Sequence, residues 1–237
     1  MAEAFKNLIH AGTVREAAAH LQRAWPGFDA ARFEALALHG LASLEFKARA
    51  LHLCAALEAT LPADFAQAAA VIEAALAPPG VGDDLSLLRS GPQGLAGWVV
   101  WPLGEFVVRR GDAQPQRALQ TLHALTQRHT AEWALRPFIE RHPAITFDTL
   151  AVWATDPSAH VRRLASEGSR PRLPWGLQLK GLIRDPSPTL PLLRALQDDP
   201  SAYVRRSVAN HLNDIAKDHP ALLAGDRKST RLNSSHD

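Results

Sequence analysis

Cysteine is nearly absent from this 237-residue sequence, which contains a single one, Cys54. One thiol cannot form an internal disulfide or a multi-cysteine zinc site. Cys54 falls in a run of helix-forming residues, so we expect it to be a buried and unreactive side chain. The eleven histidines also lack the spacing of a metal site. We therefore expect no metal and no other cofactor.

Long apolar runs are missing as well. No stretch approaches the roughly 18–20 apolar residues that cross a bilayer, and the N-terminus has no signal-peptide pattern. We therefore expect a cytoplasmic protein without membrane association.

The excess of charge is small, because the formal net charge is only +2. This value alone does not indicate a nucleic-acid partner. Arginines nevertheless gather in the C-terminal half, and a local basic surface can bind phosphate without an extreme global charge. The arginines of this kind are Arg162, Arg163, Arg170, Arg172, Arg205 and Arg206.

Aromatic residues make up 6% of the chain, whereas hydrophobic residues make up 46% and are largely alanine and leucine. Alanine and leucine are the best helix formers, and the β-branched residues that favour strands are few. The composition predicts an all-α protein. Apolar periodicity and breakers predict helices over 13–24, 30–40 and 44–59, the second capped by Asp29. The segment 61–64 is expected to open a further helix that carries Phe65.

An internal repeat occupies the second half of the chain. The segment Asp-Pro-Ser-Ala-His-Val-Arg-Arg starts at Asp156, and Asp-Pro-Ser-Ala-Tyr-Val-Arg-Arg starts 43 residues later at Asp199. A further helix start, Asp-Pro-Ser-Pro, begins at Asp185. The offset lies within the ~40–47 residues of HEAT repeats. We expect the aspartate to cap each helix, the proline to lie in its first turn, and the arginines to point outward.

The repeat predicts a HEAT-like helical solenoid, a curved α–α superhelix. We expect one domain over 1–225, with its likeliest seam at the irregular segment 78–97 but a continuous core. The last residues, 226–237, lack apolar periodicity and match the translation of a sequencing-adapter oligonucleotide. We expect them to be a non-native tail on a truncated chain; a natural disordered tail is the alternative.

Three segments carry a specific resemblance. They are TAEWALRPF at 130–138, VRRLASEGSRPRLPWG at 161–176 and YVRRSVANHLNDIAKDHP at 203–220, with further likeness at 26–29 and 101–107. These stretches resemble the AlkC family of DNA alkylation repair proteins, part of a HEAT-like superfamily that also includes AlkD. The first segment departs from the family in Trp133 and Leu135, where phenylalanine and isoleucine are expected.

The resemblance implies a monofunctional glycosylase that excises cationic bases such as 3-methyladenine from duplex DNA without flipping them into a deep pocket. It implies Glu132, Glu167 and Asp214 as catalytic carboxylates and Trp175 as the aromatic neighbour of the lesion. The six arginines named above are the expected DNA contacts. We expect a monomer that is nucleoid-associated when bound to alkylated duplex DNA.

The same residue types suit this chemistry on physical grounds. An alkylated base is positively charged, so its glycosidic bond needs little protonation. Carboxylates near the sugar can stabilise an oxocarbenium-like transition state and activate a water molecule. An indole attracts a cationic base by about 0.5–2 kcal/mol, and arginines bind phosphates through paired hydrogen bonds.

Each of these residues also has an ordinary structural interpretation. Glu167 lies near several arginines and can form a structural ion pair, Asp214 can bond a helix end, and Trp175 can pack in the core. Two other functions therefore compete with a glycosylase: a HEAT scaffold that binds an acidic protein, and a DNA-binding protein without catalysis.

Overall fold

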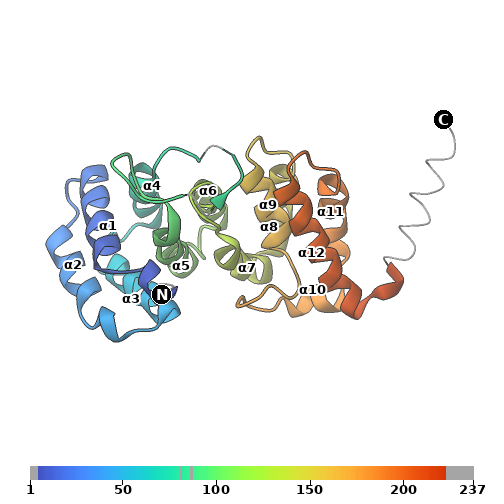
Figure 1. The fold of residues 1–237 in the computed structure, drawn as a ribbon, viewed down its shortest axis with the longest axis horizontal. Helices are drawn as coiled ribbons and strands as arrows, with labels where there is room; N and C mark the ends of the chain where they lie inside the picture. The colour runs from blue at the N-terminus through green and yellow to red at the C-terminus, as the bar shows by residue number, and fades with distance from the viewer. Residues whose placement is uncertain (1–4, 81, 86–87, 223–237) are drawn as a thin grey trace. The chain divides into compact units, whose positions relative to one another are not determined.

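The computed structural model describes residues 5–80, 82–85 and 88–222 (Figure 1). Regular structure in these residues is helical, and the extended segments form only two isolated bridges, Leu76 with Leu95 and Gly91 with Gly94. The predicted all-α class is confirmed. Within the described residues, no helix has the length and apolar character needed to cross a membrane. The predicted non-native tail at 226–237 lies outside the described residues.

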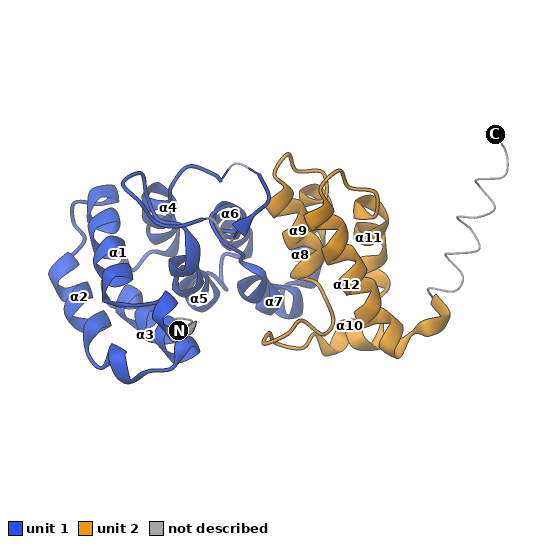
Figure 2. Ribbon diagram, viewed as in Figure 1, with its two compact units in different colours: residues 1–146 blue, residues 147–237 orange. Residues whose placement is uncertain are grey.

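The chain forms two compact units, residues 1–146 and 147–237 (Figure 2). The boundary between them falls within helix α8 (Pro143–Trp153), whereas the sequence places the likeliest seam at 78–97. The irregular segment is held within the first unit instead. Ala77 N donates to Leu95 O (3.0 Å) and Leu95 N donates to Ala75 O (2.9 Å), which ties its two ends together.

The first unit is a stack of helices in which sequence neighbours pack together. Helix α5 lies at its centre and packs against α3, α6 and α7, while α1 packs against α2 and α4. The α-helices are α1 (Ala11–Ala24), α2 (Ala30–Leu38), α3 (Phe46–Glu58), α4 (Phe65–Ala75), α5 (Val100–Arg110), α6 (Pro115–Thr126) and α7 (Glu132–Arg141). The 3-10 helices are η1 (Phe5–Leu8), η2 (Leu41–Ser43) and η4 (Gly97–Val99).

Aspartate caps open two of these helices, at Asp29 as predicted and at Asp64 in the segment expected to start a helix. Asp29 Oδ1 accepts a hydrogen bond from Arg32 N (2.9 Å) and Asp64 Oδ1 accepts one from Gln67 N (2.8 Å). Each bond satisfies a backbone donor that the first helical turn leaves unpaired. Cys54 is fully buried on α3, as predicted.

The second unit contains the repeated segments. Helix α12 packs against α9, α10 and α11, and α9 also packs against α11. Its elements after α8 are α9 (Ala159–Glu167), α10 (Lys180–Arg184), η5 (Ser187–Thr189), α11 (Leu190–Leu196) and α12 (Ala202–Asp218).

The repeated Asp-Pro-Ser segments differ in detail from the prediction. The N-cap residues of α9 and α12 are Ser158 and Ser201, and the proline precedes the helix rather than lying in its first turn. Asp156 Oδ1 accepts from Ser158 N (2.7 Å) and Asp199 Oδ1 accepts from Ser201 N (2.8 Å). The predicted capping role of the aspartate is therefore wrong. It forms an Asx turn that leads into the helix.

The first arginine of each repeat folds back onto its own loop. Arg162 Nη1 donates to Asp156 O (2.8 Å) and Pro157 O (3.0 Å), and Arg205 Nη1 donates to Asp199 O (2.5 Å) and to the carbonyl of the following proline (3.0 Å). The Nε and Nη2 atoms of Arg162 also donate to the two carboxylate oxygens of Asp199, at 2.6 and 2.9 Å. The prediction that Arg162 points outward is therefore wrong, because it links one repeat to the next.

Candidate functional site

The three predicted catalytic carboxylates are divided between the two units. Glu132 is the first residue of α7 in the first unit. Glu167 is the last residue of α9 and Asp214 lies on α12, both in the second unit. All three are buried, with exposed fractions of 7%, 5% and 2%.

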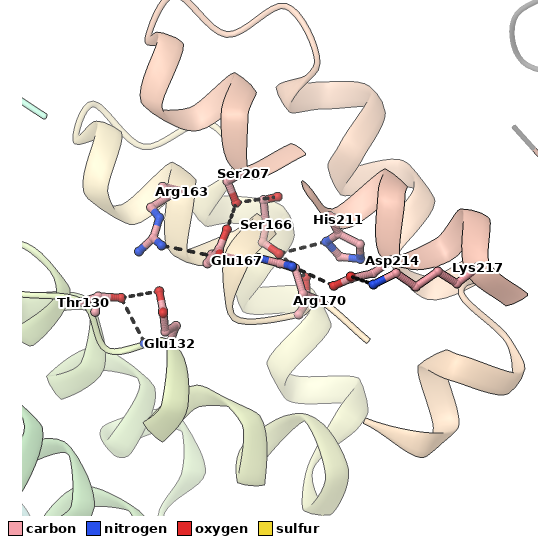
Figure 3. Close-up of polar contacts among 11 residues, drawn as sticks. Thr130, Glu132, Arg163, Ser166, Glu167, Arg170, Ser207, His211, Asp214 and Lys217 are labelled. Atoms are coloured by element: carbon pink, nitrogen blue, oxygen red, sulfur yellow. Dashed lines mark hydrogen bonds and ion pairs between the residues drawn. The ribbon is translucent and has the colours of Figure 1, made fainter. Parts of the chain in front are cut away.

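Glu132 is held by the hydroxyl of a neighbouring residue. Thr130 Oγ1 donates to Glu132 Oε2 (2.6 Å), and Glu132 N lies 3.4 Å from the same hydroxyl (Figure 3). The partial positive charge at the start of a helix favours a carboxylate at this position.

Arg170 connects the two carboxylates of the second unit (Figure 3). Its Nη1 donates to Glu167 Oε1 (2.7 Å) and its Nε donates to Asp214 Oδ2 (2.9 Å). Burial alone would lower the pKa of Arg170, but its bonds to the two carboxylates outweigh this effect and raise it. Arg170 is therefore a fixed positive charge that reduces the repulsion between Glu167 and Asp214.

Serine hydroxyls complete the surroundings of Glu167. Ser207 Oγ donates to Glu167 Oε2 (2.6 Å) and lies 3.1 Å from Ser166 Oγ. Since Ser166 and Glu167 end α9 and Ser207 lies on α12, these contacts join the two helices at the carboxylate. We refer to Glu167, Arg170, Ser207, His211, Asp214 and Lys217 as the carboxylate cluster.

His211 is fully buried within this cluster. Its Nδ1 donates to Ser166 O (2.9 Å), and in the described residues Nε2 has no hydrogen-bond partner. Burial lowers the pKa of His211 to about 4, despite the opposing effect of the bond to Ser166 O and of the nearby carboxylates. His211 is therefore neutral at neutral pH, and its hydrogen bond to Ser166 O is a second contact that joins α12 to the end of α9.

Two cations lie at the edge of the cluster. Lys217 Nζ is 3.1 Å from Asp214 Oδ1, and its side chain is 61% exposed. Arg163 Nη2 is 3.6 Å from Glu167 Oε1, and its guanidinium lies 5.0 Å from the centre of the Tyr203 ring. With Arg170, three cations face two carboxylates, so this part of the second unit is basic overall.

Trp175 is not a core residue. It is 77% exposed and has a φ of 60°, the one positive φ among the non-glycine residues described. A left-handed backbone is unfavourable for a bulky side chain and persists only where the surrounding structure enforces it. Exposure and strain together make Trp175 a candidate for a contact with another molecule.

The remaining predicted DNA contacts are placed in two ways. Arg162 and Arg172 form carboxylate pairs, with Asp199 and with Asp218. Arg205 and Arg206 are exposed on the first turns of α12. Both are exposed to an external anion, although Arg205 already donates from Nη1 to two carbonyl oxygens of its own loop, whereas Arg162 and Arg172 would have to leave a carboxylate partner.

Sequence reasoning overlooked Thr130, Ser166, Ser207, His211 and Lys217. One signal was present for Ser207, since the repeat offset aligns it with Leu164, which is fully buried. A hydroxyl at a position that the preceding repeat fills with leucine indicates a buried polar partner. Among the described residues, no group of three or more histidine, cysteine, aspartate or glutamate side chains is placed to hold a metal ion.

The chain was compared with known proteins, and no protein-family model matches it. It is 47% identical over 131 residues to the uncharacterized protein YhaZ of Bacillus subtilis (strain 168), a match covering 55% of this chain and 36% of YhaZ. It is also similar to the alkylpurine DNA glycosylase AlkC of Pseudomonas fluorescens, solved bound to DNA containing an abasic site analog. That match has 35% identity and a TM-score of 0.81, and it covers 93% of this chain and 57% of AlkC. The chain thus spans little more than half of AlkC. It has an AlkC-type fold, and the predicted helical-repeat class is confirmed.

Proposed function

We propose that this chain is the helical-repeat part of a DNA repair glycosylase that hydrolyses the N-glycosidic bond of alkylated purines. The expected substrates are cationic bases of the 3-methyladenine type in duplex DNA, attacked without deep base flipping and without a cofactor. The solved relative with the same fold is an alkylpurine DNA glycosylase bound to DNA. The scaffold and non-catalytic alternatives remain as outcomes of the test below.

The single observation that carries this proposal is the Arg170 bridge between two buried carboxylates. Burial of a carboxylate is unfavourable unless hydrogen bonds or opposite charges compensate. Glu167 and Asp214 lie on separate helices and are brought to one guanidinium at 2.7 and 2.9 Å. A chain that only needed to stack helices would be served as well by apolar side chains at these positions.

The chemistry follows from the charge that develops on the sugar. As the cationic base leaves, the deoxyribose gains positive charge, and preorganised carboxylates stabilise that charge best where water is excluded. Each carboxylate oxygen has two lone pairs, and the described contacts give Glu167 Oε2 one hydrogen bond, from Ser207. We assign Glu167 and Asp214 to stabilising the sugar cation and orienting the attacking water. Glu132, which belongs to the first unit, is a separate candidate for a catalytic carboxylate in this proposal.

DNA phosphates would strengthen this effect by competing for the outer cations. Lys217 is exposed and is held by one contact to Asp214, and Arg163 lies 3.6 Å from Glu167. A phosphate that binds either cation reduces its neutralisation of the carboxylate, which leaves more negative charge for the sugar. Arg205 and Arg206 are further phosphate contacts in this proposal, and Trp175 stacks on a base at or beside the lesion.

The proposal is tested by measuring release of free 3-methyladenine from methylated duplex DNA, together with binding of the same duplex. Release by the parent chain supports a glycosylase. Binding without release identifies a DNA-binding protein that lacks catalysis. A folded chain that neither binds duplex DNA nor releases base contradicts the proposal and favours the protein scaffold.

A further inference from the structure

Two arginine–aspartate pairs hold the loop after α9 against α12. Arg170 Nε is 2.9 Å from Asp214 Oδ2, and two residues along the loop Arg172 donates from Nε and Nη2 to both oxygens of Asp218, each at 3.0 Å. Asp214 and Asp218 are four residues apart on α12 and therefore lie on the same face of this helix. The loop is therefore attached to that face at two successive points.

The segment attached in this way ends at Trp175. Leu179 N donates to Pro171 O (3.1 Å) and Gly176 N donates to Leu173 O (3.2 Å), which closes the loop around the tryptophan. These contacts hold Trp175 at a φ of 60° with 77% of the residue exposed. Holding a bulky residue in a strained backbone conformation costs free energy, and an exposed indole gains little burial in return. We therefore take the fixed orientation of this indole to be functional.

We propose that Arg172 and Asp218 are positioning residues that fix the orientation of Trp175 for stacking on a base of bound DNA. Arg172 is thereby assigned to an internal pair rather than to a phosphate. The inner pair, Arg170 with Asp214, belongs to the carboxylate cluster, whereas the outer pair touches neither Glu167 nor Asp214. The inference rests on the proposed function for the identity of the ligand, but not for the link between the pair and the loop.

The charge states suit this role. The hydrogen bonds from Arg172 lower the pKa of Asp218, and those to Asp218 raise the pKa of Arg172. Both groups are therefore charged at neutral pH, and the pair persists until acid protonates Asp218. Fixing an aromatic side chain before DNA arrives removes part of the ordering cost of binding.

The test uses fluorine NMR of the chain labelled with 5-fluorotryptophan. The sequence has six tryptophans, and Trp175→Phe identifies the resonance of interest. Asp218→Asn is expected to shift and broaden the Trp175 resonance while leaving the other five unchanged. The charge-reversed double variant R172D/D218R is expected to restore the sharp parent resonance. An unchanged Trp175 resonance in Asp218→Asn overturns the inference.

A matched control is available in the first unit. Arg109 and Glu58 form a pair of 2.9 Å with side chains 40% and 27% exposed, compared with 32% and 28% for Arg172 and Asp218. Glu58→Gln removes a similar surface pair far from the loop in sequence. It is expected to leave the Trp175 resonance unchanged, and an effect as large as that of Asp218→Asn would mean that Trp175 reports general loosening, against the inference.

The functional arm measures base release from methylated duplex DNA. Asp218→Asn is expected to lower kcat about tenfold with nearly normal folding, within the losses seen when a reacting group is misplaced by about 1 Å. R172D/D218R is expected to recover most of the rate. If the parent chain releases no base, the proposed function fails, while the fluorine spectra still decide whether the pair positions Trp175.

Discussion

The two repeats provide a stability experiment with an internal control. Arg162 and Arg205 occupy equivalent positions, and each donates from Nη1 to two carbonyl oxygens of its own loop. Arg162 alone adds the two bonds to Asp199, whose side chain is 3% exposed. Replacing each arginine by alanine removes the loop contacts in both cases, but only Arg162→Ala also takes the arginine hydrogen bonds from the buried carboxylate of Asp199, which then keeps the bond from Ser201 N.

The expected difference follows from burial. Removing one partner of a buried ion pair costs about 3–5 kcal/mol, whereas losing hydrogen bonds from an exposed side chain costs about 1 kcal/mol. We expect Arg162→Ala to lower the free energy of unfolding by about 2–4 kcal/mol more than Arg205→Ala, by the same two estimates. Urea unfolding followed by circular dichroism measures this, and any separate transition of the first unit is common to both variants. Equal unfolding midpoints for the two variants would show that the bonds between Arg162 and Asp199 add no stability beyond the loop contacts.

The difference in free energy of unfolding between the two variants is also expected to depend on pH. Burial alone would raise the pKa of Asp199, but the bonds from Arg162 and from Ser201 N outweigh it, and the net effect lowers the pKa. A carboxylate with a lowered folded-state pKa contributes its full stability above its unfolded pKa, near 4, and loses it as pH falls through the folded value. The gap between the two variants is therefore expected to persist down to about pH 4 and to shrink below it.

Two further predictions concern pH and backbone packing. The pKa of His211 is lowered to about 4 in the folded chain. As pH falls below about 6.5, the unfolded chain therefore protonates this histidine while the folded chain does not. The free energy of unfolding is expected to fall by up to about 3 kcal/mol between pH 6.5 and 4. His211→Asn, which keeps a donor for Ser166 O, should flatten that slope in urea unfolding; an unchanged slope would contradict the assignment. Gly94 has a φ of 151°, and an added Cβ would clash with the backbone of Leu76 and Ala77, while one at Gly91 meets nothing within 4 Å. Gly94→Ala is therefore expected to cost about 2–3 kcal/mol and Gly91→Ala much less, and similar thermal midpoints would count against this packing.

Much of the fold was predictable because its signals are local. The cap at Asp29 and the segment ending at Asp64 start helices where the sequence places them, and a 43-residue repeat defines the helical layers of the second unit. The roles of the repeat residues were less predictable. An Asp-Pro-Ser segment is compatible with either an N-cap or an Asx turn. Only the packing of the two repeats shows that Arg162 donates two hydrogen bonds to Asp199.

The sequence indicated candidate site residues, but it did not indicate the contacts that connect them. Glu167 and Asp214 are 47 residues apart, and no local pattern shows that Arg170 joins them. The sequence did not decide whether Trp175 is buried or exposed, since a tryptophan after a proline is compatible with both. Its exposure depends on the loop conformation, which is set by contacts with α12 that lie far along the chain.

The role of Glu167 in base release is measured by comparing Glu167→Gln with the parent chain and with Glu140→Gln. Glu140 is an exposed glutamate on α7 and serves as the matched control. We expect single-turnover release of 3-methyladenine to fall by about 10²–10³-fold in Glu167→Gln, the loss typical of removing one preorganised electrostatic group. Glu140→Gln is expected to match the parent, and duplex binding should be retained by all three proteins. Equal rates for Glu167→Gln and the parent would contradict the claim that this carboxylate performs the chemistry.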